Sequence, residues 1–158
     1  RKISVQASRR GTAVHELAEE YMRNNSQYKA GHMPANIASF AQIRPILDKH
    51  LSMIHGLEVP LYSDKLRTAG RVDCFGVWNN QLAVIDFKTS KRPKDRKDIT
   101  NYFIQESAYA MMIYEQTGML PRKIVTVMAV DDNEPLVFIE KARDWIGKFI
   151  EMRESIDI

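Results

Sequence analysis

Residues 70–90, GRVDCFGVWNNQLAVIDFKTS, carry the strongest structural signal in the chain, because they predict two β-strands joined by Asn79 and Asn80. Asparagine tolerates positive φ angles, and a two-residue hairpin turn needs such angles at both positions. The strands are expected at about 67–78 and 81–89. The segment therefore predicts a tight antiparallel hairpin.

The turn fixes which residues of the two strands face each other. Trp78 faces Gln81, and counting outward from that pair places Asp73 opposite Asp86, with Cβ atoms about 4.5–5.5 Å apart. At an effective dielectric constant near 20 and a separation of ~5 Å, two such charges repel by roughly 3 kcal/mol. A shared proton, a basic partner or a divalent metal ion should therefore neutralise the pair.

Lys88 lies two residues beyond Asp86 and so projects from the same face of the strand. A metal ion held by two carboxylates beside a lysine has the groups that activate a water molecule and stabilise a phosphoryl-transfer transition state. The alternative is that Asp73 and Asp86 are strand-end acids that pair with Arg71 and Lys88. The same register sets Arg71 opposite Lys88, so we expect the strands to splay there or to hold an anion between them.

Alternation along the hairpin predicts that both of its faces are largely apolar, as in a sheet that is covered on each side. One face carries the two aspartates with Phe75, Val77, Leu82 and Val84, and the other carries Val72, Cys74, Trp78, Ala83, Ile85 and Phe87. We therefore expect helices to pack on both sides of the sheet.

The rest of the chain changes between a helical and a strand periodicity. The predicted helices span about 12–30, 36–55, 98–116 and 141–154, and the further strands lie at 57–62, 124–130 and 136–139. Thr12, Asn36 and Asp98 are the expected N-caps. Pro45 should split or kink the second helix, and Pro60 favours an edge strand. The order predicts one α/β domain with a central mixed β-sheet flanked by helices.

Composition limits the class of protein. The 158 residues fit one domain, and 44% hydrophobic and 27% charged residues are typical of globular proteins. No apolar run approaches the ~20 residues that a membrane helix needs. A net charge of +3 permits a polyanionic partner without requiring one. The single Cys74 excludes an intrachain disulfide and a four-cysteine iron–sulfur cluster, and the expected compartment is reducing and intracellular.

Four short motifs follow one another along the chain: Gly11-Thr12-Ala13-Val14-His15, Gly70-Arg71-Val72-Asp73, Asp86-Phe87-Lys88-Thr89-Ser90 and Gln105-Glu106-Ser107-Ala108-Tyr109. Over about residues 11–131, this ordered set resembles the RecB-like branch of the PD-(D/E)XK nucleases. The chain looks most like small single-domain members, such as the mitochondrial genome maintenance exonucleases and their phage and bacterial relatives. The resemblance implies one nuclease domain over residues 1–158, with a helical N-terminal part (12–55), a restriction-endonuclease-like catalytic core (57–140) and a C-terminal helix (141–154).

The resemblance also assigns roles to single residues. It implies that Asp73 and Asp86 bind a metal ion, that the main-chain carbonyl of Phe87 completes part of the coordination shell, and that Lys88 positions or activates the attacking water. His15 would approach from the first helix as a further ligand. The alternative for His15 is a structural histidine at a helix edge.

The cofactor implied by the resemblance is Mg²⁺ or Mn²⁺, as one or two ions. Iron–sulfur members of this branch carry four cysteines, so no such cluster is expected here. Glu58 would be the additional acid that some members use for a second metal ion. A glutamate exposed on an edge strand explains Glu58 equally well.

Contacts with DNA are expected from the loop after the second motif and from the helix that follows. Five of the seven residues 91–97 are basic, and beside a phosphodiester-cleaving site they would neutralise phosphates without reading sequence. The alternative is a solvated charged loop. Tyr109, and Tyr102 on the same helix, could stack on unpaired bases. The alternative is that tyrosines at this helical spacing belong to the core. The expected DNA-contacting residues are Arg71, Ser90, Lys91, Arg92, Lys94, Gln105 and Tyr109.

Together these observations predict a Mg²⁺- or Mn²⁺-dependent DNA exonuclease that prefers single-stranded DNA with a free end. The partner is DNA and not a membrane, and the compartment is intracellular: a bacterial or phage-infected cytoplasm, or the mitochondrial matrix. One rival is a structure-selective endonuclease with the same chemistry. The other is a catalytically silent nucleic-acid-binding module, against which the complete set of Asp73, Asp86 and Lys88 argues.

Overall fold

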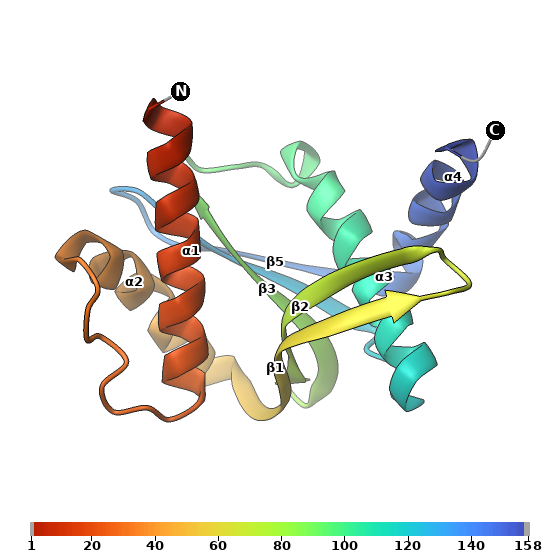
Figure 1. Ribbon diagram of the computed structural model, residues 1–158, viewed down its shortest axis with the longest axis horizontal. Helices are drawn as coiled ribbons and strands as arrows, with labels where there is room; N and C mark the ends of the chain where they lie inside the picture. Colours follow the sequence, from red (N-terminus) through yellow and green to blue (C-terminus); the bar gives the residue numbers. More distant parts are fainter. Residues whose placement is uncertain (1, 157–158) are drawn as a thin grey trace.

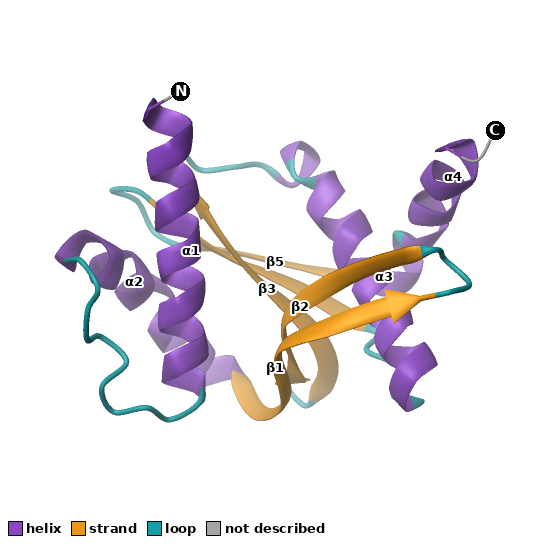
Figure 2. Cartoon of the chain, viewed as in Figure 1, coloured by secondary structure: helices purple, strands orange, loops and turns teal. Residues whose placement is uncertain are grey.

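The computed structural model describes the backbone of residues 2–156 and the side chains of residues 9–155. The helices are α1 (Lys2–Met22), α2 (Pro34–His50), α3 (Thr100–Thr117) and α4 (Ile146–Ile156), with two short 3-10 turns, η1 (Arg96–Asp98) and η2 (Ala142–Asp144). The strands are β1 (Leu51–Ser63), β2 (Thr68–Trp78), β3 (Gln81–Ser90), β4 (Lys123–Val130) and β5 (Leu136–Lys141). Figure 1 and Figure 2 show a sheet between two groups of helices. The predicted succession of helices and strands is confirmed.

The hairpin of β2 and β3 has the register predicted from the sequence. The two turn asparagines both have positive φ angles, 47° and 67°. Antiparallel pairing runs from Trp78 opposite Gln81 to Cys74 opposite Ile85 and ends there. Beyond that pair β2 stays with β1, and β3 stays with β4. The two strands therefore part immediately before the two aspartates.

The five strands form one mixed sheet in the order β1-β2-β3-β4-β5. Only the β3–β4 pair is parallel, and α3 makes the crossover that parallel strands require. Because β1 pairs with β2 alone, Pro60 lies on an edge strand as predicted.

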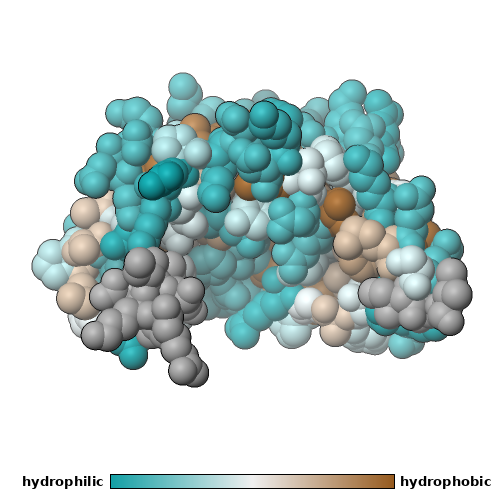
Figure 3. Space-filling view, turned by 90° about the horizontal axis from the view of Figure 1, so that it is seen from above, coloured by the Kyte–Doolittle hydropathy of each residue, from teal (hydrophilic) through white to brown (hydrophobic). Residues whose placement is uncertain are grey.

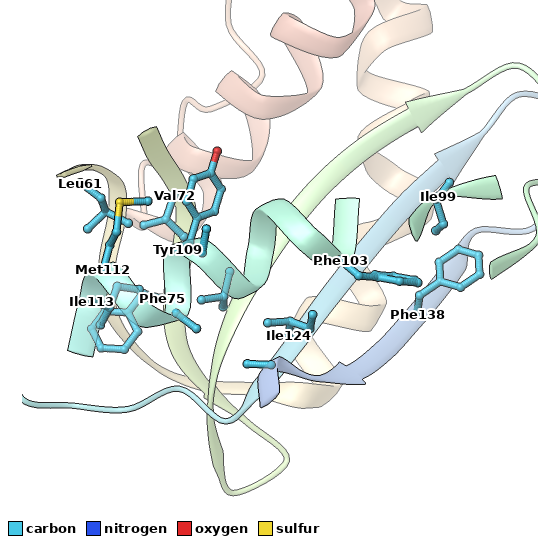
Figure 4. Packing of buried hydrophobic residues seen from close by; sticks show 14 of the residues in the cluster. Leu61, Val72, Phe75, Ile99, Phe103, Tyr109, Met112, Ile113, Ile124 and Phe138 are labelled. Atoms are coloured by element: carbon cyan, nitrogen blue, oxygen red, sulfur yellow. The ribbon is translucent and has the colours of Figure 1, made fainter. Parts of the chain in front are cut away.

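Helices cover both faces of the sheet (Figure 1). One hydrophobic core joins α1 and α2 to residues such as Trp78 and Ile85, and the other joins α3 and the start of α4 to residues such as Phe75 (Figure 4). Val72 belongs to the second core, and the prediction that it shares a face with Cys74 was wrong. Alternation fails there because β2 has left β3 and follows β1 alone.

The three predicted N-caps differ from the structure. Thr12 lies inside α1, and Asn36 lies inside α2, whose N-cap is Met33. α1 also ends well before residue 30, because the chain turns at Asn24, whose φ is 63°. Asp98 lies in η1, where its carboxylate accepts a hydrogen bond of 3.2 Å from the main-chain N–H of Asp95, and Ile99 takes the N-cap position of α3.

The region between the first helices and the hairpin also differs. α2 runs through Pro45 without a break, although a proline inside a helix removes one main-chain hydrogen bond. The helix is held because Phe40, Ile43 and Leu47, on either side of Pro45, pack on the sheet. β1 begins directly after α2 and not near residue 57, since it pairs with nearly the whole of β2. Ile54, expected on the inner side of a helix, is consequently exposed on β1.

Candidate metal centre

The two aspartates lie where β2 and β3 part. Both side chains are buried, with exposed fractions of 7% for Asp73 and 5% for Asp86. Asp73 Oδ2 accepts a hydrogen bond of 2.8 Å from the main-chain N–H of Phe87. The predicted splaying next to Arg71 and Lys88 therefore occurs, and the Asp73 carboxylate takes the place of a lost main-chain partner.

The pair is neutralised by a shared proton and by a basic partner. Burial raises the pKa of Asp86 to about 8, and the charge of Asp73 adds to this rise. Burial would also raise the pKa of Asp73, but hydrogen bonds to His15 and Asp86 and the charge of His15 outweigh it and lower that pKa. At neutral pH Asp86 thus holds a proton that it shares with the ionised Asp73.

His15 projects from α1 to the same point. Its Nε2 lies 2.6 Å from the main-chain oxygen of Phe87, and its Nδ1 lies 3.3 Å from Asp73 Oδ1. Burial alone would lower the pKa of His15, but its hydrogen bond with Asp73 and the charge of that aspartate raise the pKa to about 9. The imidazolium therefore bridges two oxygens that a metal ion could also use, and such an ion would have to displace its protons.

Glu58 reaches toward the site from the edge strand β1. Its φ of 50° is uncommon for a residue other than glycine. Its Oε2 lies 3.0 Å from Nε of Arg71, and burial together with the charge of Asp73 raises its pKa. Glu58 is thus part of the acidic cluster and not a glutamate pointing into solvent. Arg71, which is exposed, binds Glu58 instead of facing Lys88.

These side chains form a group that could hold a metal ion. His15, Glu58 and Asp73 each offer a ligand atom within 4.8 Å of the others. Asp86 Oδ2 is buried, and its partner is the ammonium of Lys88, whose Nζ lies 3.2 Å away. Carboxylate oxygens suit Mg²⁺ or Mn²⁺, whereas imidazole is a more usual ligand of zinc, iron, nickel and copper.

Lys88 lies beside this group on the side of the sheet that α3 covers. Its ammonium lies 3.2 Å from Asp86 Oδ2 and 4.5 Å from the centroid of the Tyr102 ring. Burial would lower the pKa of Lys88, but the charge and hydrogen bonding of Asp86 raise it. The lysine therefore stays charged and can stabilise an anion next to the carboxylates.

Glu106 is a further acid at this site, and sequence reasoning assigned it no role. It has an exposed fraction of 0%, and Oγ1 of Thr126 lies 2.9 and 2.7 Å from its two oxygens. Thr126 is the partner of Asp86 across β3 and β4. Burial, with the charge of Asp86, raises the pKa of Glu106 well above its usual value. In the sequence, the spacing of three residues from both Phe103 and Tyr109 indicates that Glu106 lies on the buried side of the helix.

Tyr109 is buried, whereas Gln105 is exposed to solvent. The Tyr109 ring is 8% exposed, and a Cβ atom at Gly70 would lie 2.5 Å from its Cε1, so the ring packs where only glycine fits. Its hydroxyl points out of the apolar cluster (Figure 4), and burial with the charges of the two aspartates raises its pKa to about 12. The expected stacking of a base on this buried ring does not fit. Gln105 is exposed, and its side chain forms no hydrogen bond within residues 9–155.

The basic loop starts at the end of β3. The Ser90 hydroxyl donates a hydrogen bond of 2.6 Å to the main-chain oxygen of Arg92. Lys91, Arg92 and Lys94 are exposed and have no acidic partner among the described side chains, whereas Arg96 pairs with a glutamate of β5. The loop crosses the top of Figure 1, and Figure 3, seen from that side, is hydrophilic across its middle. Three of the predicted loop cations are thus free to meet a polyanion.

The chain has the fold of a solved protein. The crystal structure of a putative exonuclease from Eubacterium rectale aligns with a TM-score of 0.62 over 92% of this chain and 64% of that chain, at 17% sequence identity. This chain therefore spans 64% of the length of that relative. The likeness supports the mixed α/β fold with its five-stranded sheet.

A second alignment is weaker. The crystal structure of the protein SSO0001 aligns with a TM-score of 0.43 and 15% identity, over 92% of this chain and 75% of that chain. No protein-family model and no curated protein matches the chain.

Proposed function

We propose that the protein is a Mg²⁺- or Mn²⁺-dependent deoxyribonuclease of the RecB-like PD-(D/E)XK type. The observation that carries the proposal is the meeting of Asp73, Asp86, Lys88 and His15 at the point where the central strands part. A silent binding module would have no chemical need for the complete set of Asp73, Asp86 and Lys88. The likeness to a putative exonuclease supports the proposal at the level of the fold.

Each side chain of the site would have a separate role in hydrolysis. A divalent ion held by Asp73, Asp86 and the Phe87 carbonyl would supply a bound water of lowered pKa and neutralise charge on the phosphate. Both aspartates would bind the ion as carboxylates, so Asp86 would lose its shared proton to solvent. His15 would have to lose a ring proton, and the hydrogen bond that this proton makes, to act as a further ligand. The Lys88 ammonium donates to a phosphate oxygen and stabilises the negative charge that develops there.

The basic loop and Arg71 position the strand. Lys91, Arg92 and Lys94 lie directly after β3, which carries Asp86 and Lys88, so they contact phosphates next to the one that is cleaved. Contacts of this kind fix orientation and are insensitive to sequence. Ser90 shapes the start of this loop through its hydrogen bond to Arg92.

The preferred substrate in this proposal is a single strand with a free end. α1 and α3 stand on opposite sides of the sheet beside the acids, and a flexible strand enters between them more readily than a duplex about 20 Å across. Every element between residues 2 and 156 belongs to the sheet or to the helices that cover it, so this part of the chain offers no separate strand-opening unit. A structure-selective endonuclease is the second candidate, since Asp73, Asp86 and Lys88 would serve it equally.

The proposed setting is intracellular. In the part of the chain from residue 2 to residue 156, no helix has the length and apolar character to cross a bilayer. The buried thiol of Cys74, whose pKa burial raises to about 12, has no cysteine partner in the chain.

The test uses end-labelled linear single strands, blunt duplexes and circular single strands, with Mg²⁺, Mn²⁺ or EDTA. We expect metal-dependent digestion of the linear single strand and survival of the circle. Asp73→Asn, Asp86→Asn and Lys88→Ala should each remove the activity, whereas Asp64→Asn, at an exposed acid of the β1–β2 turn, should keep it. Digestion in EDTA would overturn the metal assignment. Ready linearisation of the circle would favour the endonuclease.

A further inference from the structure

A second pocket lies at the other end of the sheet from the acids. It has a volume of about 350 Å³ and is enclosed by the C-terminal half of α3, the segment before β4, and the residues from the end of β5 to the start of α4. Gln81, the first residue of β3, lies at its edge, and Asp86 is five residues further along that strand. At ~3.3 Å per residue the edge of the pocket at Gln81 is roughly 17 Å from Asp86 along β3. It is therefore a separate site.

The pocket has an apolar floor and an apolar opening. Ala110 and Ala142 are buried at its base, and Met111 and Ile146 line its sides. Leu120 also lines it and is 37% exposed, so the apolar surface continues outward to solvent. Water in such a pocket finds few polar partners, and an apolar group that displaced it would gain free energy.

Three cations surround this apolar surface. Arg122, Lys141 and Arg143 all line the pocket and are exposed. Among the described residues none of them forms an ion pair. The adjacent Glu140 is occupied by Arg96, and Asp144 makes no ion pair with the three cations. The charges are therefore available to a ligand.

An apolar pocket beside unpaired cations favours a ligand that carries both an apolar group and acids. Phosphates of DNA would match the charges but would leave the apolar pocket unfilled, and an apolar partner without acids would leave the charges unmatched. We infer that this pocket docks an acidic peptide segment of a partner protein, which inserts one apolar side chain and pairs its acids with Arg122, Lys141 and Arg143. Central apolar anchors with a charged rim are the usual anatomy of such contacts. This inference does not depend on the nuclease proposal.

The test measures binding of fluorescein-labelled peptides to the full chain by anisotropy. The probe is a short peptide with one Phe flanked by Asp residues, and the controls replace that Phe by Ser or the Asp residues by Lys. The double variant Lys141→Glu/Arg143→Glu should weaken binding about tenfold or more, because it turns two attractions into repulsions. The control Lys29→Glu/Lys49→Glu changes the charge equally on the other side of the molecule and should bind as the wild type does. Should the reversals affect folding, Arg143→Gln replaces them.

The outcomes separate the inference from its rivals. Binding that needs both the Phe and the Asp residues, and that the pocket variants alone weaken, supports peptide docking. Equal binding of the Ser-containing peptide would show attraction of any polyanion and overturn it. Displacement of the peptide by a short oligonucleotide would assign the cations to a DNA path and overturn it as well. No binding by the wild type would also overturn it. Metal-dependent cleavage should be unchanged in the pocket variants, so the two proposals fail separately.

Discussion

The acidic site has two halves that differ in charge although both are built from carboxylates. On the side of α1, Asp73 is ionised because the imidazolium of His15 binds it, and Glu58 binds Arg71. On the side of α3, burial raises the pKa of Asp86 to about 8 and the pKa of Glu106 well above its usual value. Cationic partners thus favour ionised acids in one half, and burial favours neutral acids in the other.

Because the two halves hold protons, a divalent metal ion would have to displace those protons to bind between them. A divalent ion between the halves would ionise Asp86 and displace the protons of His15, so binding and proton release are linked. Substitutions and titrations can remove or measure this difference in ionisation between the two halves.

The largest effect is expected from removing the acid that joins the two halves. Asp86→Asn should lower the rate of cleavage by about 10²–10³-fold or more, because it deletes a metal ligand. The same change should raise the melting temperature without metal, since the amide needs no proton to be neutral. Rates from a gel assay and calorimetric scans check both expectations. Wild-type cleavage by this variant would contradict the assignment.

Lys88→Met tests a charge that belongs to neither half. It should lower the cleavage rate by about 10²-fold or more, because no ammonium then stabilises the phosphate charge, while metal affinity stays near that of the wild type. Isothermal titration with Mn²⁺ separates the two effects. A loss of metal binding equal to that of Asp86→Asn would show that Lys88 only maintains the carboxylates.

The basic loop should contribute affinity without sequence preference. Lys91→Ala/Arg92→Ala/Lys94→Ala should weaken binding of single-stranded DNA similarly for all sequences and flatten the slope of log K against log salt by up to about two units, at ~0.7 for each of three phosphate contacts. Fluorescence anisotropy at several salt concentrations measures that slope. An unaltered slope would leave the loop as a solvated charged segment.

Stability without metal should fall as the pH rises. His15 has a pKa of about 9 against an ordinary 6.5, and Asp86 has a pKa of about 8 against 3.8, so the folded chain binds more protons than the unfolded chain between those values. The linked stability is complete below the lower value and is lost as the pH passes the upper one. The melting temperature should drop from pH 6.5 to 9, most steeply below 8 where both groups contribute. Saturating Mn²⁺ should abolish this decline, and a decline that persisted would contradict the linkage.

The smallest effect is expected at Glu106. If this acid is neutral, Glu106→Gln keeps the contact with Thr126 and raises the melting temperature by about 2–4 °C for each ~1 kcal/mol gained. Metal affinity should change little. Thr126→Val is the matched control, because it leaves the buried acid without its partner and should lower the melting temperature. A large loss of metal affinity in Glu106→Gln would place this acid among the ligands.

Local rules predicted the part of the fold that holds the site. The asparagine turn set the register of β2 and β3 as far as Cys74 and Ile85. Asp73 and Asp86 follow directly where the strands part, and their side chains interact there. The expected repulsion of Arg71 and Lys88 matches the point where the strands part. These features depend on residues close in sequence or on a strict two-residue period, which one chain reveals.

Features that depend on distant packing could not be predicted. Pro45 stays within α2 because three apolar residues hold the helix to the sheet, and Ile54 is in β1 because β2 offers it a hydrogen-bonding partner. The burial of the Tyr109 ring depends on the approach of α3 to Gly70. The burial of Glu106 follows from its spacing to Phe103 and Tyr109, but its contact with Thr126 on β4 depends on the packing of α3 against the sheet.

If the two halves of the acidic site share one divalent metal ion, manganese should bind between Asp73 and Asp86. Anomalous diffraction at the manganese edge, from crystals soaked in MnCl₂, should then show a strong peak about 2.0–2.6 Å from carboxylate oxygens of both aspartates. A peak that contacts only exposed acids, or no peak between the two aspartates at saturating manganese, would contradict it.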